Sequence, residues 1–344
     1  MKTKNATGSR MSDVPAFSLI ELLVASAVFL LVAVAVAAIV SSTAQVSGLA
    51  RSKIRAEGIV NQVFDRMAAD FQRAVLRADL PDRFEKLAGN DILTFFARAD
   101  AYTGDRGISK ISYKVDDGNL LRGAEGFSWV ITGPLPQLPL IGTTPDSPSD
   151  PTATVFTETM EPLILDPENF ERLGSGVFRM EYCFLLKDGT LSTVPVIQLL
   201  GVLNALAATI SPDITATGYV AGSRWFRPTS ASSASRTFVC TGTTATTSTW
   251  KRLGWDDVAG IVVGIAVVDP ETRQAFADFL TPAKLNELAQ AFPAAANGND
   301  ILEAWNGVST TDQPDWEERL QDLGLPSKIL EGISVRQQYF RIGN

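Results

Sequence analysis

The longest apolar run in the chain extends from Phe17 to Val40 and contains one ionisable residue, Glu21. The other positions are Leu, Val, Ala, Ile and Phe, with two serines. A helix of about 24 residues at ~1.5 Å per residue is ~36 Å long, which exceeds the ~30 Å hydrocarbon core of a bilayer. The pattern therefore predicts a transmembrane helix over residues 17–40.

Glu21 is the anomaly in this run, because an ionised carboxylate inside a membrane span is costly and usually functional. An anchor that only holds a protein in a bilayer gains nothing from such a residue. We therefore expect Glu21 to have an oppositely charged partner. The alternative is that its side chain extends to the lipid headgroups from an ordinary anchor.

Beyond the apolar run, the hydrophobic positions recur at steps of three and four residues, with charged residues between them, as on an amphipathic helix. These positions are Val46, Leu49, Val60, Val63, Phe64, Met67, Phe71 and Val75. Gly48 and Gly58 weaken a helix by about 1 kcal/mol each, which a long helix tolerates. We predict one continuous helix from about Phe17 to Asp79, ended by Pro81. Its second half, within residues 41–80, is expected to pack on a globular domain.

From Asp91 onward the apolar positions change to the two-residue period of β-strands. The turn Asp116–Asn119 predicts a hairpin, since Gly118 tolerates the positive φ of tight turns. Val258–Asp269 is almost entirely apolar, as in a central strand buried on both faces. Other predicted strands cover Ile92–Phe96, Val177–Leu186 and an edge strand near Val335–Ile342. With helical segments after Asp269, residues 81–344 are predicted to form an α+β, mainly antiparallel head on the long N-terminal helix.

Two segments of the head have a distinct composition. Residues 133–153 are rich in Pro, Thr, Ser and Asp and are predicted to be a loop. Residues 213–252 are rich in Ser, Thr and Gly and are predicted to form a β-rich insertion. Its aromatic residues Trp225, Phe226 and Trp250 form either a contact patch for a partner or the small core of the insertion itself.

The charged and reactive residues exclude several classes of function. The net charge is −8, and removing residues 1–16 would make it −10, so nucleic acid is not an expected partner. The sequence has no histidine, which excludes Ser-His-Asp, Cys-His and His-metal chemistry. No cofactor motif occurs, and we expect no cofactor, no metal and no enzymatic activity. The paired acids Asp79/Asp82, Asp116/Asp117, Asp256/Asp257 and Asp312/Asp315 lack the spacing of a calcium loop.

The chain contains two cysteines, Cys183 and Cys240. In an exported protein such a pair can form a disulfide, but a single pair defines no framework. Nothing in the sequence fixes the distance between them, so a Cys183–Cys240 disulfide and two free thiols both stay open.

The N-terminal residues resemble the prepilin signal of type IV pilins and type II secretion pseudopilins. Basic residues Lys2, Lys4 and Arg10 precede Phe17-Ser18-Leu19-Ile20-Glu21-Leu22-Leu23, which matches the F-[ST]-L-[IL]-E-[LV]-L motif at every position. The resemblance implies that prepilin peptidase removes a leader of residues 1–16 by cutting between Ala16 and Phe17. It also implies that the new Phe17 amine is methylated and that Glu21 pairs with this amine in a neighbouring subunit. Ala16 departs from the family, which prefers Gly before the cut.

Weaker similarities extend into the head. The segment Phe64–Ala74 and the Tyr113-x-Val115…Gly118-x-Leu120-x-Arg122 pattern resemble J-type minor pseudopilins. The chain is most similar to minor pseudopilins of the J or W type. Within that class, the combination of a short leader, a large head and a Trp-bearing insertion resembles the Verru_Chthon cassette protein C family.

The resemblance implies a non-enzymatic minor pilin or pseudopilin with a pilin-like fold, assembled into a type IV pilus-like or type II secretion filament. The large head suits a tip or priming subunit. Its implied partners are prepilin peptidase, other pilin or pseudopilin subunits, the assembly platform and the inner membrane, with the head in the periplasm or on the cell surface. Two alternatives stay open: a single-pass, membrane-anchored periplasmic binding or sensor protein, and a secreted enzyme freed by proteolysis.

Overall fold

Two compact units, Met1–Arg51 and Ser52–Asn344, make up the chain. The computed structural model describes residues 18–76, 82–102, 107–127, 165–197, 205–206, 219–226, 237–245, 247–295, 300–306 and 320–342. The predicted loop at 133–153 lies outside these residues. Helix α1 (Leu19–Gln72) has 54 residues and contributes to both units.

In the first unit, α1 carries a segment that is long and apolar enough to cross a membrane. This segment, Leu19–Thr43, has 25 residues and a mean hydropathy of 3.0, and none of its most apolar window is buried. The predicted apolar helix is therefore confirmed.

In the second unit, one face of α1 is buried in the main core. Its core residues recur at steps of three and four positions, with one adjacent pair, Val63 and Phe64: Ala56, Val60, Val63, Phe64, Met67 and Phe71. The second half of the predicted helix is thus amphipathic, with an apolar face that packs on strands.

The predicted end of the helix at Asp79 is wrong, because α1 ends at Gln72. Immediately after it, Ala74 forms a β-bridge with Ala97, and the Val75 amide donates to the Phe96 carbonyl at 2.8 Å. The chain therefore exchanges helical hydrogen bonds for pairing with a strand before it reaches Pro81.

The first sheet is antiparallel, in the order β1-β2-β3-β4-β5. Its strands are β1 (Arg83–Glu85), β2 (Ile92–Ala97), β3 (Ile108–Asp116), β4 (Asn119–Phe127) and β5 (Phe170–Ser175), which follows the short 3-10 helix η2 (Pro167–Asn169). The predicted β3–β4 hairpin is confirmed. Asp117 and Gly118 both have positive φ, 49° and 67°, as a tight hairpin turn requires.

The central sheet is also antiparallel, in the order β13-β12-β6-β7. Its strands are β6 (Val177–Leu186), β7 (Leu191–Ser192), β12 (Val258–Val268) and β13 (Ile333–Arg341). A turn with Gly189 at φ 86° joins β6 to β7. Strand β12 lies between β6 and β13 and is buried along nearly all of its length, and β13 is an edge strand, so both predictions are confirmed.

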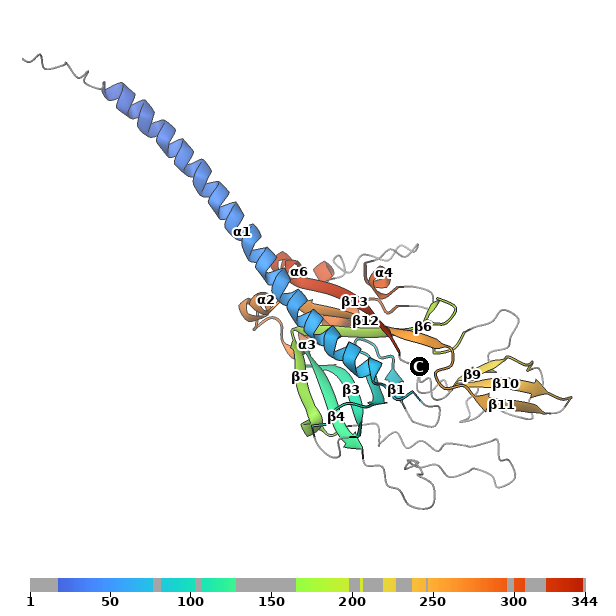
Figure 1. The fold of residues 1–344 in the computed structure, drawn as a ribbon. Coiled ribbons are helices and arrows are strands. Elements are labelled where there is room, and N and C mark those ends of the chain that lie inside the picture. The colour runs from blue at the N-terminus through green and yellow to red at the C-terminus, as the bar shows by residue number, and fades with distance from the viewer. Residues whose placement is uncertain are drawn as a thin grey trace, which may run out of the picture. The chain divides into compact units, whose positions relative to one another are not determined.

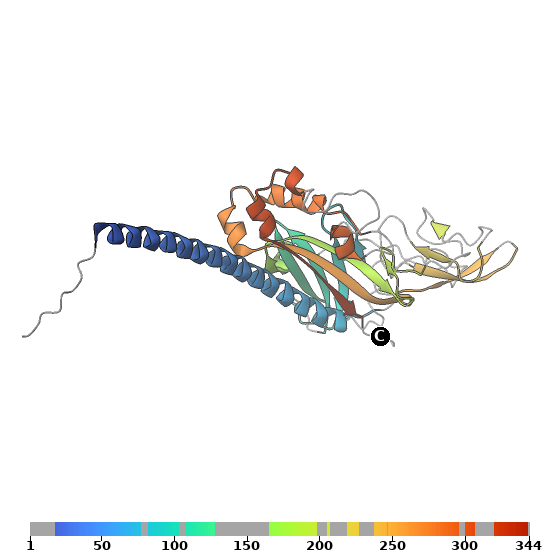
Figure 2. The same ribbon diagram turned by 90° about the horizontal axis from the view of Figure 1, so that it is seen from above.

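The central sheet lies between α1 with the first sheet on one side and a group of short helices on the other (Figures 1 and 2). A hydrophobic cluster lies on each of its faces. One face packs against α1 and the first sheet, through residues such as Tyr182 and Ile261. The other face packs against helices, through residues such as Phe178 and Val262. The helices that contribute buried residues to this cluster are α3 (Pro282–Ala291), α4 (Ile301–Asn306) and α6 (Ser327–Glu331), whereas the short α2 (Pro270–Ala275) contributes none. The second unit is therefore a layered α+β structure, as predicted.

The expected β-rich insertion at residues 213–252 supplies three strands of a small sheet in the order β11-β10-β9-β8, and β8 lies before the predicted range. Its strands are β8 (Ala205–Leu206), β9 (Arg224–Phe226), β10 (Thr237–Thr243) and β11 (Ser248–Arg252). Arg224 ties the small sheet to the residues before β12 through an ion pair of 2.9 Å with Asp257.

Candidate functional site

Glu21 and Ser18 form a reciprocal pair at the start of α1. The Glu21 carboxylate accepts hydrogen bonds from the Ser18 backbone amide at 3.1 Å and the Ser18 hydroxyl at 3.0 Å. The Glu21 amide in turn donates to the Ser18 hydroxyl oxygen at 3.2 Å. This is a capping box, in which residues three apart satisfy two backbone donors that a helix start leaves unpaired.

The capping box engages one oxygen of the carboxylate and leaves the other open. All three hydrogen bonds involve either Oε2 of Glu21 or its amide, and among the described residues no group donates to Oε1. Glu21 is exposed in the isolated chain. The carboxylate can therefore hold its own helix start and still accept a hydrogen bond or ion pair from another molecule.

The helix that follows presents apolar side chains on every side. Its large hydrophobic residues between Leu19 and Val40 are 53–81% exposed. A helix that is apolar all round is stable only when it is buried in a membrane or among other helices. The isolated chain supplies neither environment, so this surface requires lipid or other subunits.

A buried ion pair joins the end of α1 to the first sheet. The Asp70 carboxylate accepts from Arg122 Nε at 2.7 Å, from Arg122 Nη2 at 3.1 Å and from the Tyr113 hydroxyl at 2.5 Å. Burial raises the pKa of Tyr113 well above its ordinary value, and the Asp70 charge raises it further. The bidentate geometry fixes the helix against β3 and β4.

A second buried group of charges lies between the central sheet and the helices. The Glu181 carboxylate accepts from Lys86 Nζ at 3.1 Å, Arg179 Nη2 at 2.9 Å, the Ala295 amide at 2.8 Å and Trp305 Nε1 at 3.0 Å. Both of its oxygens are thus occupied by donors of the fold. We assign Glu181 to the support of the fold and not to proton transfer.

The paired acids at loops gain no ligand-like arrangement in the described part of the chain. No group of three or more His, Cys, Asp or Glu side chains is placed to hold a metal ion within those residues. Asp257 accepts from the Ile197 amide at 3.0 Å and pairs with Arg224. Asp79, Asp312 and Asp315 lie outside the described residues.

The two cysteines are free thiols, so the structure does not form the disulfide that the sequence left open. Cys183 packs on the helix side of the central sheet, and burial raises its pKa to about 12. Cys240 lies in β10 of the small sheet, where its Sγ is 3.4 Å from the Gly242 carbonyl oxygen. Each thiol is buried within its own sheet, which keeps the two apart.

The aromatic residues of the small sheet mainly pack with each other. Trp225 is fully buried, and its ring lies 5.2 Å from that of Phe238. The interpretation of Trp225 as part of an exposed contact patch is therefore wrong. Trp250 is half-buried against Tyr219 and donates from Nε1 to the Ser248 hydroxyl at 2.8 Å. For these two residues the small-core interpretation holds. The side chain of Phe226 lies outside the described residues.

Of the N-terminal site residues, Glu21 is described, and Ala16 and Phe17 lie outside the described residues. The role of Ser18 was missed, although the Ser-x-x-Glu spacing of a capping box is visible in the sequence. The Asp70–Arg122 pair was also missed, and no local signal could have revealed it, because its members belong to separate elements.

No protein-family model and no curated protein matches the chain. Among solved structures, a type IV-like pilin from Thermus thermophilus matches at 10% identity, over 84% of this chain and 98% of that one, with a TM-score of 0.29. A score this low defines no detailed correspondence. The α+β assignment therefore follows from the long helix and the antiparallel sheets themselves.

Proposed function

We propose that the chain is a non-enzymatic, pilin-like subunit that is held in a membrane by the first part of α1. The observation that carries the proposal is Leu19–Thr43, a fully exposed apolar helix with a single carboxylate in its first turn. The same helix continues into an amphipathic half that packs on an α+β unit. Before assembly lipid covers the apolar half, and after assembly the helices of other subunits cover it.

The proposal includes processing at the N-terminus. Prepilin peptidase cuts between Ala16 and Phe17, and the Phe17 amine is then methylated. In the assembled filament this ammonium meets Glu21 of a neighbouring subunit, where an opposite charge offsets the desolvation of the carboxylate. The open Oε1 of Glu21 can accept this contact while Oε2 keeps the capping box intact.

The position of the subunit is part of the proposal. A second unit of this size crowds a regular helical shaft, which favours a minor subunit at the tip or in priming of a type IV pilus-like or secretion filament. The membrane is then the inner membrane, the assembly platform is a partner, and the second unit lies in the periplasm or on the cell surface.

The test is the N-terminus of the membrane-extracted protein, produced together with its prepilin peptidase. Intact mass and N-terminal sequencing should give a chain that begins at Phe17 and carries one added methyl group. Ala16→Gly, which restores the residue preferred at the cut, should be processed at least as fully. A chain that begins at Met1 in both proteins would contradict the proposal.

One observation favours a second candidate, a single-pass anchored binding or sensor protein. The capping box gives the Glu21 carboxylate hydrogen-bond partners within its own chain, so a neighbouring subunit is not required. This candidate predicts an uncut N-terminus and unchanged behaviour of Glu21→Gln. The pilin-like proposal predicts that Glu21→Gln is still cut but no longer co-purifies with filaments.

A further inference from the structure

Strand β13 is the longest edge strand in the described sheets. It has nine residues, compared with six in β5, five in β11, three in β1 and two in β7 and in β8. It pairs with β12 in unbroken register from Ile333 to Arg341, and it contains no proline. A long edge without a bulge or a proline is a template for another strand.

The register shows which backbone groups of β13 face outward. The Asp269 amide donates to the Gly332 carbonyl at 2.9 Å, and the Ile342 amide donates to the Ala259 carbonyl at 3.5 Å. Hydrogen-bonded pairs alternate in an antiparallel ladder, so the even-numbered residues bond to β12. The outward amides and carbonyls belong to Ile333, Val335, Gln337, Tyr339 and Arg341. Within the described part of the chain, no other backbone group bonds to them.

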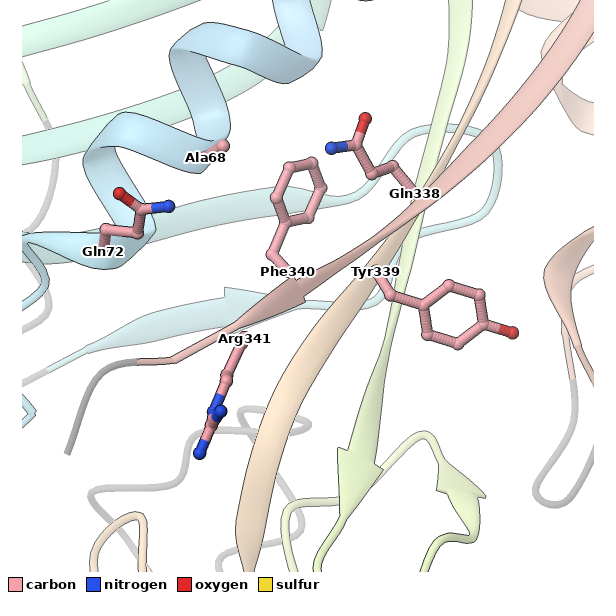
Figure 3. A pocket seen from close by; sticks show the side chains of 6 residues that line it. All are labelled: Ala68, Gln72, Gln338, Tyr339, Phe340 and Arg341. Carbon is pink, nitrogen blue, oxygen red and sulfur yellow. The ribbon is translucent and has the colours of Figure 1, made fainter.

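A hollow adjoins the C-terminal half of this edge. It has a volume of about 390 Å³ and is lined by Gln338–Arg341 of β13 and by Ala68 and Gln72 of α1 (Figure 3). Phe340 points toward α1 in this view, and Tyr339 points the opposite way. The volume of this hollow is within the range of protein ligand sites. A segment of another polypeptide can therefore lie beside β13 without displacing α1.

The charges at this edge favour an acidic partner. Of the described residues that line the hollow, Arg341 alone is charged, and it is exposed. Among the described residues it forms no ion pair, whereas Arg336 on the same strand pairs with Glu57. Nearby Asp300 is occupied by the Tyr339 hydroxyl at 2.7 Å and by Gln337 Nε2 at 2.6 Å. Asp300 keeps its negative charge but its carboxylate already accepts these two hydrogen bonds, whereas Arg341 has no ion-pair partner among the described residues and is free to meet a carboxylate.

We propose that β13 is the docking edge for an extended segment of a partner polypeptide that carries a carboxylate. The segment adds to the central sheet as a further strand, bonds to the outward amides and carbonyls, and places its carboxylate against Arg341. The amides of Gln72 and Gln338 provide additional polar contacts in the hollow. This inference does not depend on the pilin-like function, because it rests on the second unit alone.

The test uses detergent-solubilised full-length protein and a fluorescein-labelled peptide of alternating Thr and Val with one central Asp. Binding should slow hydrogen exchange at the amides of Gln337, Tyr339 and Arg341 by about tenfold or more, as expected for amides that gain a bond. The amides of Gln338 and Phe340 already bond to β12 and serve as internal controls. The same peptide with N-methyl groups along one edge should lose this protection.

The role of the Arg341 charge is tested by reversing the charge on the peptide and on the protein. Replacing the peptide Asp by Lys should weaken binding by about fivefold, near the upper limit for an exposed ion pair. Arg341→Glu should reverse the preference between the two peptides, and Arg341→Gln should remove it. Arg172→Glu, on the edge strand of the first sheet, is the matched control and should change neither.

Three outcomes would overturn the proposal. The first is binding without protection of the outward amides, and the second is equal binding of the N-methylated peptide. The third is protection of the same amides in protein alone at rising concentration, which would make a second copy of the chain the occupant.

Discussion

The two halves of α1 contrast sharply, although they belong to one continuous helix. Between Leu19 and Val40 the large apolar side chains point in all directions and are exposed. From Ala56 to Phe71 the buried side chains occupy one face, and Asp65 between them is exposed. The contrast teaches that the distribution of apolar residues around a helix, more than their number, determines what the helix packs against.

The two halves also place their carboxylates differently. Asp70 is buried and receives a bidentate arginine and a tyrosine hydroxyl. Glu21 is exposed, and its hydrogen bonds come from the first turn of its own helix. One carboxylate therefore supports the tertiary structure of the second unit, whereas the other remains accessible to another molecule.

The largest expected effect separates two phenylalanines of the same helix. Phe71 is 1% exposed and stacks on Phe95 at 4.9 Å, whereas Phe29 is 73% exposed. Phe71→Ala should lower the free energy of unfolding by about 3–5 kcal/mol, the usual cost of such a core truncation. Phe29→Ala should leave it unchanged. Urea titration in detergent measures the free energy of unfolding of both variants. An equal loss in both would contradict the contrast between the two halves of α1.

The next effect separates the two carboxylates. Asp70→Asn leaves the Arg122 guanidinium buried without its counter-charge and should cost about 3 kcal/mol of unfolding free energy. Glu21→Gln should not change the unfolding of the second unit. The double variant Asp70→Leu with Arg122→Met should recover much of the loss, because both charges are then absent. A single variant as stable as the wild type would show that the pair contributes little.

A smaller effect concerns pH. Burial raises the pKa of the Cys183 thiol to about 12 in the folded protein, from an ordinary value of 9.0. The unfolded chain therefore loses this proton first, and stability should fall as pH rises from about 9 to 12. Cys183→Ala should reduce the slope of unfolding free energy against pH in this window. Cys240→Ala is the control, and an unchanged slope in Cys183→Ala would contradict the assignment.

The smallest effect is local to the helix start. Ser18→Ala removes the hydroxyl that accepts from the Glu21 amide and should speed hydrogen exchange there by about fivefold, the usual effect of losing a cap. Ser26→Ala is a matched control, since that hydroxyl donates to the Leu23 carbonyl within the helix. Equal acceleration in both variants would indicate that the capping box does not order the first turn.

Features set by local periodicity were predictable from the sequence. The apolar helix, the β3–β4 hairpin, the buried strand β12 and the edge strand β13 follow from patterns that span fewer than 30 residues. The end of α1 was not predictable in this way. Val75 bonds to Phe96 rather than continuing the helix, and this choice depends on where β2 lies.

The residues of the candidate site also differ in whether local sequence or tertiary contacts determine their surroundings. Glu21 was identified because a carboxylate interrupts an apolar run, and its local partner Ser18 was available at the spacing of a capping box. The burial of Trp225 and the Asp70–Arg122 pair depend on contacts between separate elements. No local sequence motif predicts such contacts. A sequence pattern can state that an aromatic or charged residue needs a partner without stating which one it gets.

The two glycine turns have a practical consequence for imaging this protein. At Gly118 an added Cβ would lie 2.3 Å from Leu285, and Arg273 donates to the Gly118 carbonyl at 3.1 Å, so the turn is clamped against the helices. At Gly189 no atom lies within 4 Å of that position. An epitope or fluorophore tag inserted after Gly189 should therefore extend into solvent. An insertion at the similar turn of Gly118 would disrupt its packing against Leu285 and Arg273.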